Sequence, residues 1–496
     1  MFEQIRRLVS HVLVYGFGNV GNRLVGFLLI PVYSRYLTPE DYGVLALVAM
    51  FSEILFTLMN MGQSSALFRT YFAHDDPERR ETVLSTSLWL VLTLSFPVGL
   101  LALVLSKPLG WLLTGSPAYT VWVMLGIGGI AFKTLLRLPF SVLRAREESR
   151  RYAGFALVQT VVGLALAIIF VVGLHLGGRG VLLSQLVAEV LLCIYLVPTM
   201  LRGRALRFSM GDARDLLGYG LALIPAGLLS FLLHLSDRYF LKHFASLHVV
   251  GLYALGHRFG EILYFAIFAF ELAWPQFLFG HRKSVEAPTL YARVCTYFLA
   301  VMGFLWLTVS LLSEEIVRIM AHPSFHEAHR VIPWIAGAFL FQGLGYVGNV
   351  GMRLHRIVKY RLLISGSTTA LHLGLNFFLI PRYGMMGASA SALVTFAFQF
   401  VFQILMGHGL YPVPYEYARI ARLAVVGIAL YAVGSLVEWG SIWTALAGKA
   451  FLLCCAPLLL YVSGFLEPGE LARLRGSLGS LRRWPGALLQ VRGSGK

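Results

Sequence analysis

Charged residues are scarce in this chain of 496 residues. Asp, Glu, Lys and Arg together make up 13% of it, about half of the roughly 25% that is usual in soluble globular proteins. Hydrophobic residues make up 57% and gather in long runs, and a helix needs roughly 20 apolar residues to cross the hydrocarbon of a membrane. The composition therefore excludes a soluble domain and predicts an all-α integral membrane protein.

Cysteines and catalytic motifs are scarce as well. The four cysteines lie in apolar runs without the spacing of a metal or redox site, and we interpret them as small core residues: Cys193, Cys295, Cys454 and Cys455. The stretch Gly16–Gly21 reads GFGNVG, but it lies inside a predicted membrane span with no strand before it, so it does not indicate a dinucleotide site. The sequence contains no ATP-binding motif and no group of residues arranged for catalysis. We therefore expect no cofactor, no metal and no enzymatic activity.

Apolar stretches predict 14 transmembrane helices. Their approximate bounds are 12–36, 43–63, 83–106, 119–141, 153–176, 180–201, 217–242, 250–272, 291–313, 330–352, 361–381, 386–407, 420–437 and 442–466. Because the number is even, both chain ends lie on one side of the membrane. If that side is the cytoplasm, the inner segments hold 28 of the 41 Lys and Arg residues and the outer segments hold 8. This bias is typical of a multi-pass membrane protein with cytoplasmic termini.

Basic residues outnumber acidic ones, with 41 Lys and Arg against 24 Asp and Glu. Such an excess can accompany nucleic-acid binding, but here the basic residues lie in short loops between apolar runs. We therefore expect membrane lipids, and no nucleic acid, as partners. After Glu467 the chain places leucines at helical spacing among arginines. This pattern predicts a basic helix on the inner leaflet, with a basic tail that has no fixed structure as the alternative.

Two parts of the chain repeat each other. With a shift of 208 residues, Tyr36–Phe56 aligns with Phe244–Tyr264 without a gap, and 7 of the 21 positions are identical. A second alignment further along the chain has a shift of 207 residues. The identical pairs of the first alignment include Gly43 with Gly251 and Glu53 with Glu261. Each copy holds six spans, and an even number keeps both copies in the same orientation, as in transporters whose halves are related by an axis along the membrane normal.

This repeat predicts the domain organisation. We expect two pseudo-symmetric six-helix lobes, residues 1–210 and 211–415. Transmembrane helices 13 and 14, residues 416–466, fall outside the repeat and form an accessory pair. Residues 467–496 form the basic cytoplasmic tail. Substrate sites of such parallel-repeat transporters lie between the two lobes.

Ten charged residues lie inside predicted spans: Arg23, Glu53, Lys133, Arg137, Glu189, Asp237, Arg238, Arg258, Glu261 and Glu271. An ionised side chain at the middle of the bilayer costs about 2.5–3.5 kcal/mol, so such residues are expected to face a cavity or a partner. Seven of the ten lie in spans 1, 2, 7 and 8, which correspond to each other in the repeat. The charges are therefore expected to line a central cavity.

Among these residues, Arg23 and Arg258 are our candidates for binding an anionic head group, because a guanidinium binds phosphate through two parallel hydrogen bonds. Asn19 and Asn22 lie beside Arg23 and are candidates for binding sugar hydroxyls. The remaining candidates are the carboxylates Glu53, Glu261 and Asp237, which would titrate if transport is coupled to an ion, and the further cavity charge Arg238. The alternative for each is an ion pair between helices without a ligand. For Lys133 and Arg137 the alternative is snorkelling to the inner surface.

Four motifs resemble the Wzx-type oligosaccharide flippases of the MOP superfamily, which also contains the MATE drug exporters and the lipid II flippases. The motifs are IPVYSRYLTPEDYGVLAL (Ile30–Leu47), GQSSALFRTY (Gly62–Tyr71), SDRYFLKHFASLHVVGLYALGHRFGEI (Ser236–Ile262) and IPRYGMMGASASAL (Ile380–Leu393). The resemblance implies a two-lobed bundle around a cationic cavity. It implies transport by alternating access, in which a polyprenyl-diphosphate-linked oligosaccharide moves from the cytoplasmic to the outer face of the bacterial inner membrane.

Such a flippase serves the synthesis of O-antigen, capsule or exopolysaccharide, with glycosyltransferases and a polysaccharide polymerase as expected partners. One alternative is an ion-coupled, MATE-type exporter of small molecules. Another is a scaffold of a polysaccharide assembly complex that transports nothing. A sugar permease of the major facilitator type is disfavoured because its Gly-x-x-x-Asp-Arg-x-Gly-Arg signature is missing between the second and third spans.

Overall fold

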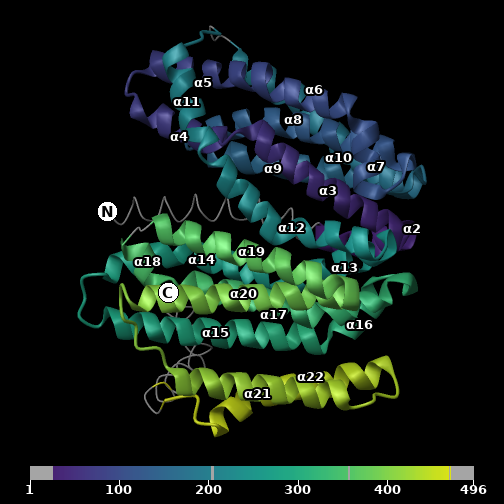
Figure 1. The fold of residues 1–496 in the computed structure, drawn as a ribbon, viewed down its shortest axis with the longest axis vertical. Helices are drawn as coiled ribbons and strands as arrows, with labels where there is room; N and C mark the ends of the chain where they lie inside the picture. The colour runs from purple at the N-terminus through teal and green to yellow at the C-terminus, as the bar shows by residue number, and fades with distance from the viewer. Residues whose placement is uncertain (1–25, 203–205, 356–357, 468–469, 471–496) are drawn as a thin grey trace, which may run out of the picture.

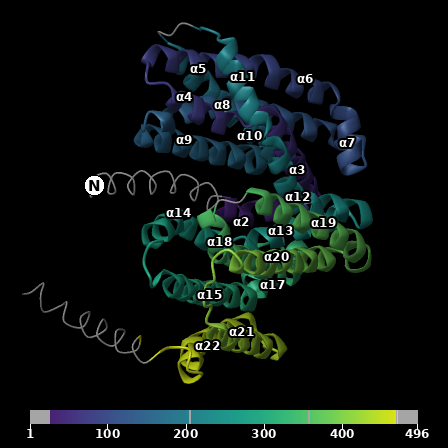
Figure 2. The ribbon, with the colours of Figure 1, turned by 60° about the vertical axis from the view of Figure 1, so that its left-hand side comes forward.

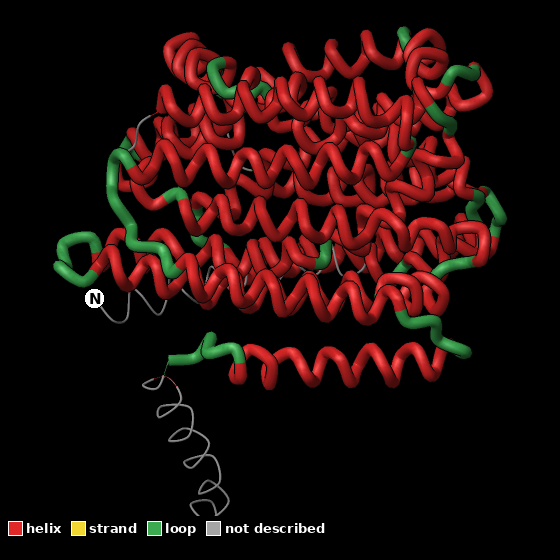
Figure 3. The backbone as a smooth tube through the Cα atoms, turned by 60° about the horizontal axis from the view of Figure 1, so that its bottom comes forward, coloured by secondary structure: helices red, strands yellow, loops and turns green. Residues whose placement is uncertain are grey.

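The computed structural model describes residues 26–202, 206–355, 358–467 and 470. Within these residues all regular elements are helices, and Figure 3 shows them as red tubes joined by short green loops. Thirteen segments of this described part are long and apolar enough to cross a membrane. Each overlaps one of the predicted spans from 43–63 onward. The predicted span 12–36 lies mostly outside the described residues. The all-α membrane fold is confirmed, with a count close to the expected 14.

The first bundle contains the helices up to residue 221, drawn in purple and blue in Figure 1. Its helices are α3 (Pro39–Asn60), α4 (Gln63–Ala73), α5 (Pro77–Leu90), α6 (Phe96–Val104), α7 (Ser106–Thr114), α8 (Thr120–Ala145), α9 (Ser149–Ile168), α10 (Gly177–Leu201) and α11 (Met210–Leu221). The short helix α2 (Ile30–Tyr36) precedes them. Helices α8 and α10 pack closely against each other, and α3 packs on α8.

The second bundle, drawn in teal and green, follows directly. Its helices are α12 (Ile224–Phe244), α13 (Leu247–Gly260), α14 (Leu263–His281), α15 (Ala287–Leu311), α16 (Ser313–Met320), α17 (Ile332–Gly348), α18 (Val350–His355), α19 (Val358–Tyr383) and α20 (Met385–His408). The pair α21 (Tyr417–Leu436) and α22 (Ile442–Val462) lies against α15, on the side of the second bundle away from the first. Both views show this separation (Figures 1 and 2).

Local sequence signals explain where α3 begins and ends. Thr38 caps its start, because the Thr38 hydroxyl accepts from the Asp41 N–H at 3.1 Å and the Asp41 carboxylate accepts from the Thr38 N–H at 3.2 Å. Pro39 fits the first turn, where no backbone N–H is needed. Met61 and Gly62, with φ of 45° and 65°, end α3 and turn the chain into α4.

The predicted span 250–272 is interrupted in the structure. Residues 250–272 were expected to form a single helix, but α13 ends at Gly260 and α14 begins at Leu263. The end of α13 lies very close to α17, since a Cβ on Gly260 would come within 2.6 Å of Ile335 Cγ2. The interruption places Glu261 in the turn between α13 and α14.

The two bundles meet where α3 packs against α13. Gly43 and Gly251, the identical pair of the repeat, lie in this contact. A Cβ on Gly43 would lie 2.1 Å from the Leu247 carbonyl oxygen, and a Cβ on Gly251 would lie 1.8 Å from the Pro39 carbonyl oxygen. Only glycine allows the two backbones to come this close.

A polar pair next to the glycines also joins equivalent positions. Glu40 Oε1 lies 2.9 Å from His248 Nδ1, and these residues are 208 positions apart, the shift of the repeat. Residues that a repeat aligns with each other come into contact where they lie near the axis that relates the two copies. Figure 1 shows the bundles converging at this end and diverging toward the other.

Candidate functional site

Three of the predicted substrate-binding residues, Asn19, Asn22 and Arg23, lie outside the described residues. The fourth, Arg258, is exposed on α13 and donates a hydrogen bond from Nη1 to the Gly26 carbonyl oxygen at 3.2 Å. One residue further along each segment, Phe27 packs edge-on against Phe259, with ring centroids 5.4 Å apart. Arg258 is thus positioned where the start of the described chain meets the second bundle.

The predicted carboxylates differ in their surroundings. Glu261, in the turn after α13, is half-buried. Glu53, on α3, is exposed and lies 3.7 Å from Lys133 Nζ of α8. Its side chain is 51% exposed and that of Lys133 is 39% exposed, so solvent weakens this ion pair and both groups are accessible to a ligand.

Lys133 and Arg137 form a cationic patch together with the ring of Phe56. The Lys133 ammonium lies 5.4 Å and the Arg137 guanidinium carbon 5.2 Å from the Phe56 ring centroid. The two cations are four residues apart on α8, so they lie on one helix face. We did not predict either as a substrate ligand. Their spacing was the signal that could have grouped them, but the sequence does not show that α3 brings Phe56 to the same face.

The lone acid Glu189 has a partner within the first bundle. Gln159 of α9 donates a hydrogen bond to Glu189 Oε1 at 2.9 Å. The other oxygen, Oε2, is buried without a hydrogen-bond partner among the described groups. Glu189 therefore lies half-buried among protein groups, within electrostatic range of Lys133 and Arg137.

Asp237 and Arg238 form a buried ion pair, with Arg238 Nη1 3.0 Å from Asp237 Oδ1. The Tyr253 hydroxyl donates to the other Asp237 oxygen, and the Arg238 guanidinium also donates to the His234 carbonyl oxygen at 3.2 Å. Only 3% of Asp237 and 8% of Arg238 is exposed. In this conformation both charges are satisfied within the second bundle.

A large cavity of about 770 Å³ lies between the second bundle and the accessory pair. Helices α15, α17, α20, α21 and α22 line it, almost entirely with apolar side chains. Even Trp306 presents only its ring, because its indole N–H donates to the Pro333 carbonyl oxygen at 3.0 Å. We call this space the apolar cavity. It suits hydrocarbon, whose transfer from water is favourable by about 0.8 kcal/mol per CH₂ group.

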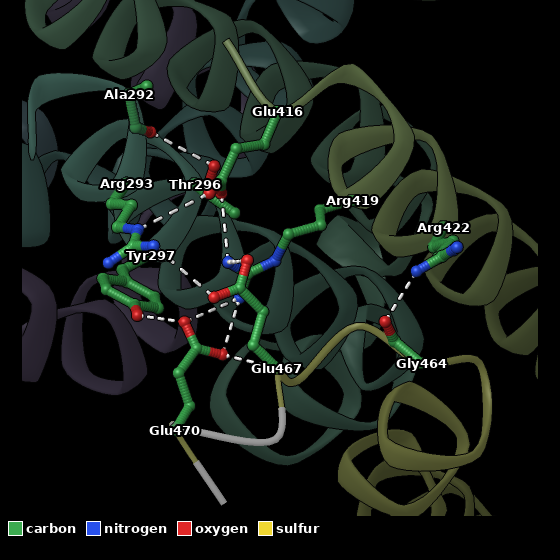
Figure 4. A network of polar contacts seen from close by, with 10 residues as sticks. All are labelled: Ala292, Arg293, Thr296, Tyr297, Glu416, Arg419, Arg422, Gly464, Glu467 and Glu470. Atoms are coloured by element: carbon green, nitrogen blue, oxygen red, sulfur yellow. Dashed lines mark hydrogen bonds and ion pairs between the residues drawn. The ribbon is translucent and has the colours of Figure 1, made fainter. Parts of the chain in front are cut away.

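A polar network holds the accessory pair against the second bundle at one end of the apolar cavity (Figure 4). Arg419 of α21 is its centre, with only 8% of the side chain exposed. Its guanidinium lies 3.1 Å from Glu416 and 3.0 Å from Glu470, and it also faces the Phe465 ring at 4.8 Å. Three segments far apart in the sequence contribute to the network: the start of α15, the start of α21 and the chain after α22.

Helix α15 contributes Arg293 and Tyr297 to this network. Arg293 lies 3.9 Å from Glu416 and 3.6 Å from Glu467, and the Tyr297 hydroxyl donates to Glu470. Burial opposes the ionisation of Glu470. The hydrogen bonds from Tyr297 and from the Glu467 N–H, together with the guanidinium charge, nevertheless hold the pKa of Glu470 below its ordinary value.

Comparisons with known proteins agree with this architecture. The family model described as "Polysaccharide biosynthesis protein" matches residues 32–270. The chain is 25% identical over 296 residues to the succinoglycan biosynthesis transport protein ExoT of Rhizobium meliloti, a match that covers 56% of each chain. It is 24% identical over 275 residues to the Lsg locus putative protein 1 of Haemophilus influenzae, covering 53% of this chain and 63% of that one. The matches thus span less than two thirds of either curated relative.

Solved structures show the same fold over nearly the whole chain. The lipid II flippase MurJ in an inward closed conformation matches with a TM-score of 0.72 at 11% identity, covering 91% of this chain and 98% of that one. An inward-facing multidrug resistance MATE transporter of the MOP superfamily matches with a TM-score of 0.62 at 16% identity, covering 81% and 96%. The chain is therefore a multi-pass membrane protein related to the polysaccharide biosynthesis proteins, built on the fold of the MOP transporters.

Proposed function

We propose that this protein moves a polyprenyl-diphosphate-linked oligosaccharide across the bacterial inner membrane, from the cytoplasmic to the outer face. The observation that carries the proposal is that Arg137 and Arg258 are exposed and Lys133 is half-exposed, although all three lie in predicted membrane spans. A cation there costs about 2.5–3.5 kcal/mol unless it faces water or an anion. A diphosphate head group would neutralise such residues, and Arg23 of the predicted first span would add a further cation.

The apolar cavity supports a lipid-linked cargo over a free sugar. A polyprenyl chain has no polar groups beyond its diphosphate, so it needs a continuous hydrocarbon surface while its head group is in water. The apolar cavity offers such a surface beside the second bundle. A free saccharide would gain nothing from this lining, because its hydroxyls would lose their hydrogen bonds to water.

The contact between the bundles supports alternating access. By the charge pattern of the loops, the end of α3 that carries Glu40 and Gly43 faces the outside. The bundles converge at this end and diverge at the other (Figure 1), so this conformation is closed to the outside. Rocking of the bundles about the α3–α13 contact would open the outer side.

Export of small cationic molecules is the second candidate, because MATE transporters share the fold. The exposed patch disfavours it. Among the side chains open to a ligand, Lys133 and Arg137 carry two positive charges against one on Glu53, while the nearby Glu189 is half-buried. The accessible face therefore favours anions over cations. Uptake of cationic dyes into cells lacking the protein, compared with cells that have it, separates the two functions.

Deletion of the gene in its native bacterium tests the proposal. We expect the lipid-linked oligosaccharide to accumulate on the cytoplasmic face and surface polysaccharide to be lost, with both restored by the intact gene. Glycosyltransferases and a polymerase would act before and after this step as partners. Normal surface polysaccharide in the deletion strain, without accumulated intermediate, would exclude the proposed function.

A further inference from the structure

The second bundle contains another cavity, of about 250 Å³, that the proposed function does not use. It lies among α12, α17, α18, α19 and α20. Four amide side chains dominate its polar lining: Gln342, Asn349, Gln399 and Gln403. We call this space the amide cavity. The segment 353–361 contains four Lys and Arg residues, which assigns this end of the bundle to the cytoplasmic side.

Four polar atoms of the amide cavity are buried without a hydrogen-bond partner among the described groups. They are Gln342 Oε1, Asn349 Oδ1, Gln403 Oε1 and Arg353 Nε. The amide nitrogen of Gln342 lies 3.1 Å from His234 Nε2, so its oxygen is the end that stays unpaired. Unsatisfied buried polar atoms are strongly disfavoured. The residues that line the cavity therefore carry three acceptors and one donor that no described protein group satisfies.

The charge of the lining restricts the class of ligand. No Asp or Glu is among the described residues that line the amide cavity, whereas Arg353 is, with its guanidinium carbon 3.9 Å from the Tyr346 ring centroid. Glu271 interacts with Tyr346 from outside this lining. Three amide oxygens alone could attract a cation, but the lining itself adds a positive charge and no carboxylate to hold one. The ligand is therefore neutral or anionic.

Size and shape point to a sugar ring. The space would hold about eight water molecules at roughly 30 Å³ each, or one six-membered sugar ring with a few waters. Sugar hydroxyls both donate and accept, as amides do. The aromatic side chains Phe341, Tyr346, Phe396 and Phe400 offer apolar surface to the C–H face of a ring.

We propose that the amide cavity binds a single pyranose residue, neutral or carrying a carboxylate. The inference rests on the proposed function, because the bound sugar would be part of the glycan of the lipid-linked cargo. A site for one sugar residue, apart from the exposed cations, would let the protein distinguish glycans that carry the same lipid diphosphate.

Binding of soluble glycosides tests the site without any lipid. The full-length protein, purified in detergent, is titrated with the methyl glycosides of glucose, galactose, N-acetylglucosamine and glucuronic acid, and binding is followed by saturation-transfer NMR. At least one of the four should bind saturably. The variants Gln342→Leu and Gln403→Leu should weaken it at least about tenfold. Gln159→Leu, which alters a glutamine of the first bundle, serves as the matched control and should leave the affinity unchanged.

Thermal unfolding without sugar accompanies the titration. Gln403→Leu should unfold at the wild-type temperature or above it, because the substitution removes an unpaired polar atom, so that lost binding cannot be attributed to misfolding. Absence of saturable binding up to about 50 mM, or equal binding by wild type and Gln403→Leu, would overturn the inference. A protein that binds a glycoside and translocates no lipid-linked saccharide would overturn the proposed function alone. One that translocates cargo and binds no glycoside would overturn only the sugar site.

Discussion

Single residues decide how closely the two bundles approach each other. At Gly43 and Gly251 the helices α3 and α13 are in backbone contact, so any side chain at either position forces the backbones apart. The alignment of the repeat identified this pair as identical. It did not show that the two glycines face each other, because a sequence repeat identifies equivalent positions without stating which of them lie near the axis.

Gly43→Leu tests this contact. A leucine side chain would meet the Leu247 backbone, which cannot move like a flexible side chain. We expect a cost of about 3 kcal/mol, at the upper end of overpacking penalties, and a loss of about 100-fold in the population of the outward-closed state. Thiol labelling of a cysteine introduced at Leu47, which is fully buried on α3 one turn after Gly43, should then become fast. Gly129→Leu on α8, where a Cβ meets nothing within 4 Å, is the control and should label like the parent. Unchanged labelling in Gly43→Leu would mean that this contact is not the gate.

The cationic patch gives a second prediction for single residues. Lys133→Gln and Arg137→Gln should each lower the transport of an anionic cargo about tenfold or more, because a hydrogen bond to a charged group contributes about 1.5–3 kcal/mol. Restoration of surface polysaccharide in a deletion strain measures the effect, and protein levels are checked in parallel. Arg150→Gln, which changes an exposed arginine at the start of α9, should complement fully. Full complementation by both patch variants would exclude the patch from cargo binding.

Side-chain direction explains which candidate residues could be recognised from the sequence. The intramembrane charges themselves were evident, because any charge in an apolar run stands out. The sequence could not show that Asp237 and Arg238 pair with each other behind Tyr253, since this depends on the rotation of α12 about its axis. The same limit applies to Phe56 and its two cations.

Among the helices, the accessory pair depends most on a few polar contacts. The buried Arg419 links α21 to Glu416 and to the chain after α22. Arg419→Met should destabilise the docking of α21 and α22 by about 3 kcal/mol, because it leaves partly buried carboxylates without their cation. Limited proteolysis of the loop between α20 and α21 should accelerate. The control is Arg422→Met. It removes an exposed arginine that donates a hydrogen bond to the Gly464 carbonyl oxygen, and this variant should be cleaved at the wild-type rate. Equal cleavage rates of the wild type and both variants would mean that Arg419 does not hold α21 and α22 in place.

The same network predicts a dependence on pH. The pKa of Glu470 lies below its ordinary value in the folded protein, so its ionised form stabilises the docked pair. This stabilisation is complete above the ordinary carboxyl pKa of about 4.3 and is lost as the pH falls through the lower, folded-state value. Thermal unfolding at pH 7 and pH 3.5 should therefore show a smaller loss of stability on acidification in Glu470→Gln than in wild type. An identical loss would exclude Glu470 as a contributor.

Hydropathy predicted the helices better than their interruptions. The thirteen membrane-crossing segments follow from runs of apolar residues, which any span must have. The break after Gly260 was not predicted, because the apolar runs 250–256 and 262–270 on either side of it were taken together as one span. At the break Gly260 lies close to Ile335 of α17, a contact that the sequence does not show.

In the whole molecule, two bundles related by the repeat converge on equivalent residues, and a separate helix pair encloses an apolar cavity beside one of them. The two-lobed membrane architecture was predicted from the repeat and from the count of spans, and the MOP-type fold from the resemblance of four motifs. The apolar and amide cavities could not be predicted, because each is lined by helices whose relative positions only the folded bundle sets. Under the proposed function, the apolar cavity would hold a hydrocarbon chain and the amide cavity a sugar.

Translocation by the purified protein tests the central claim most directly. Proteoliposomes that contain a polyprenyl-diphosphate-linked oligosaccharide are treated with a glycosidase that cannot cross the bilayer, and the protected fraction of the glycan is followed over time. We expect the protein to expose the protected glycan far faster than protein-free vesicles do, and Arg258→Gln to remove most of this difference. A protected fraction that decays at the same rate with and without the protein would contradict the account.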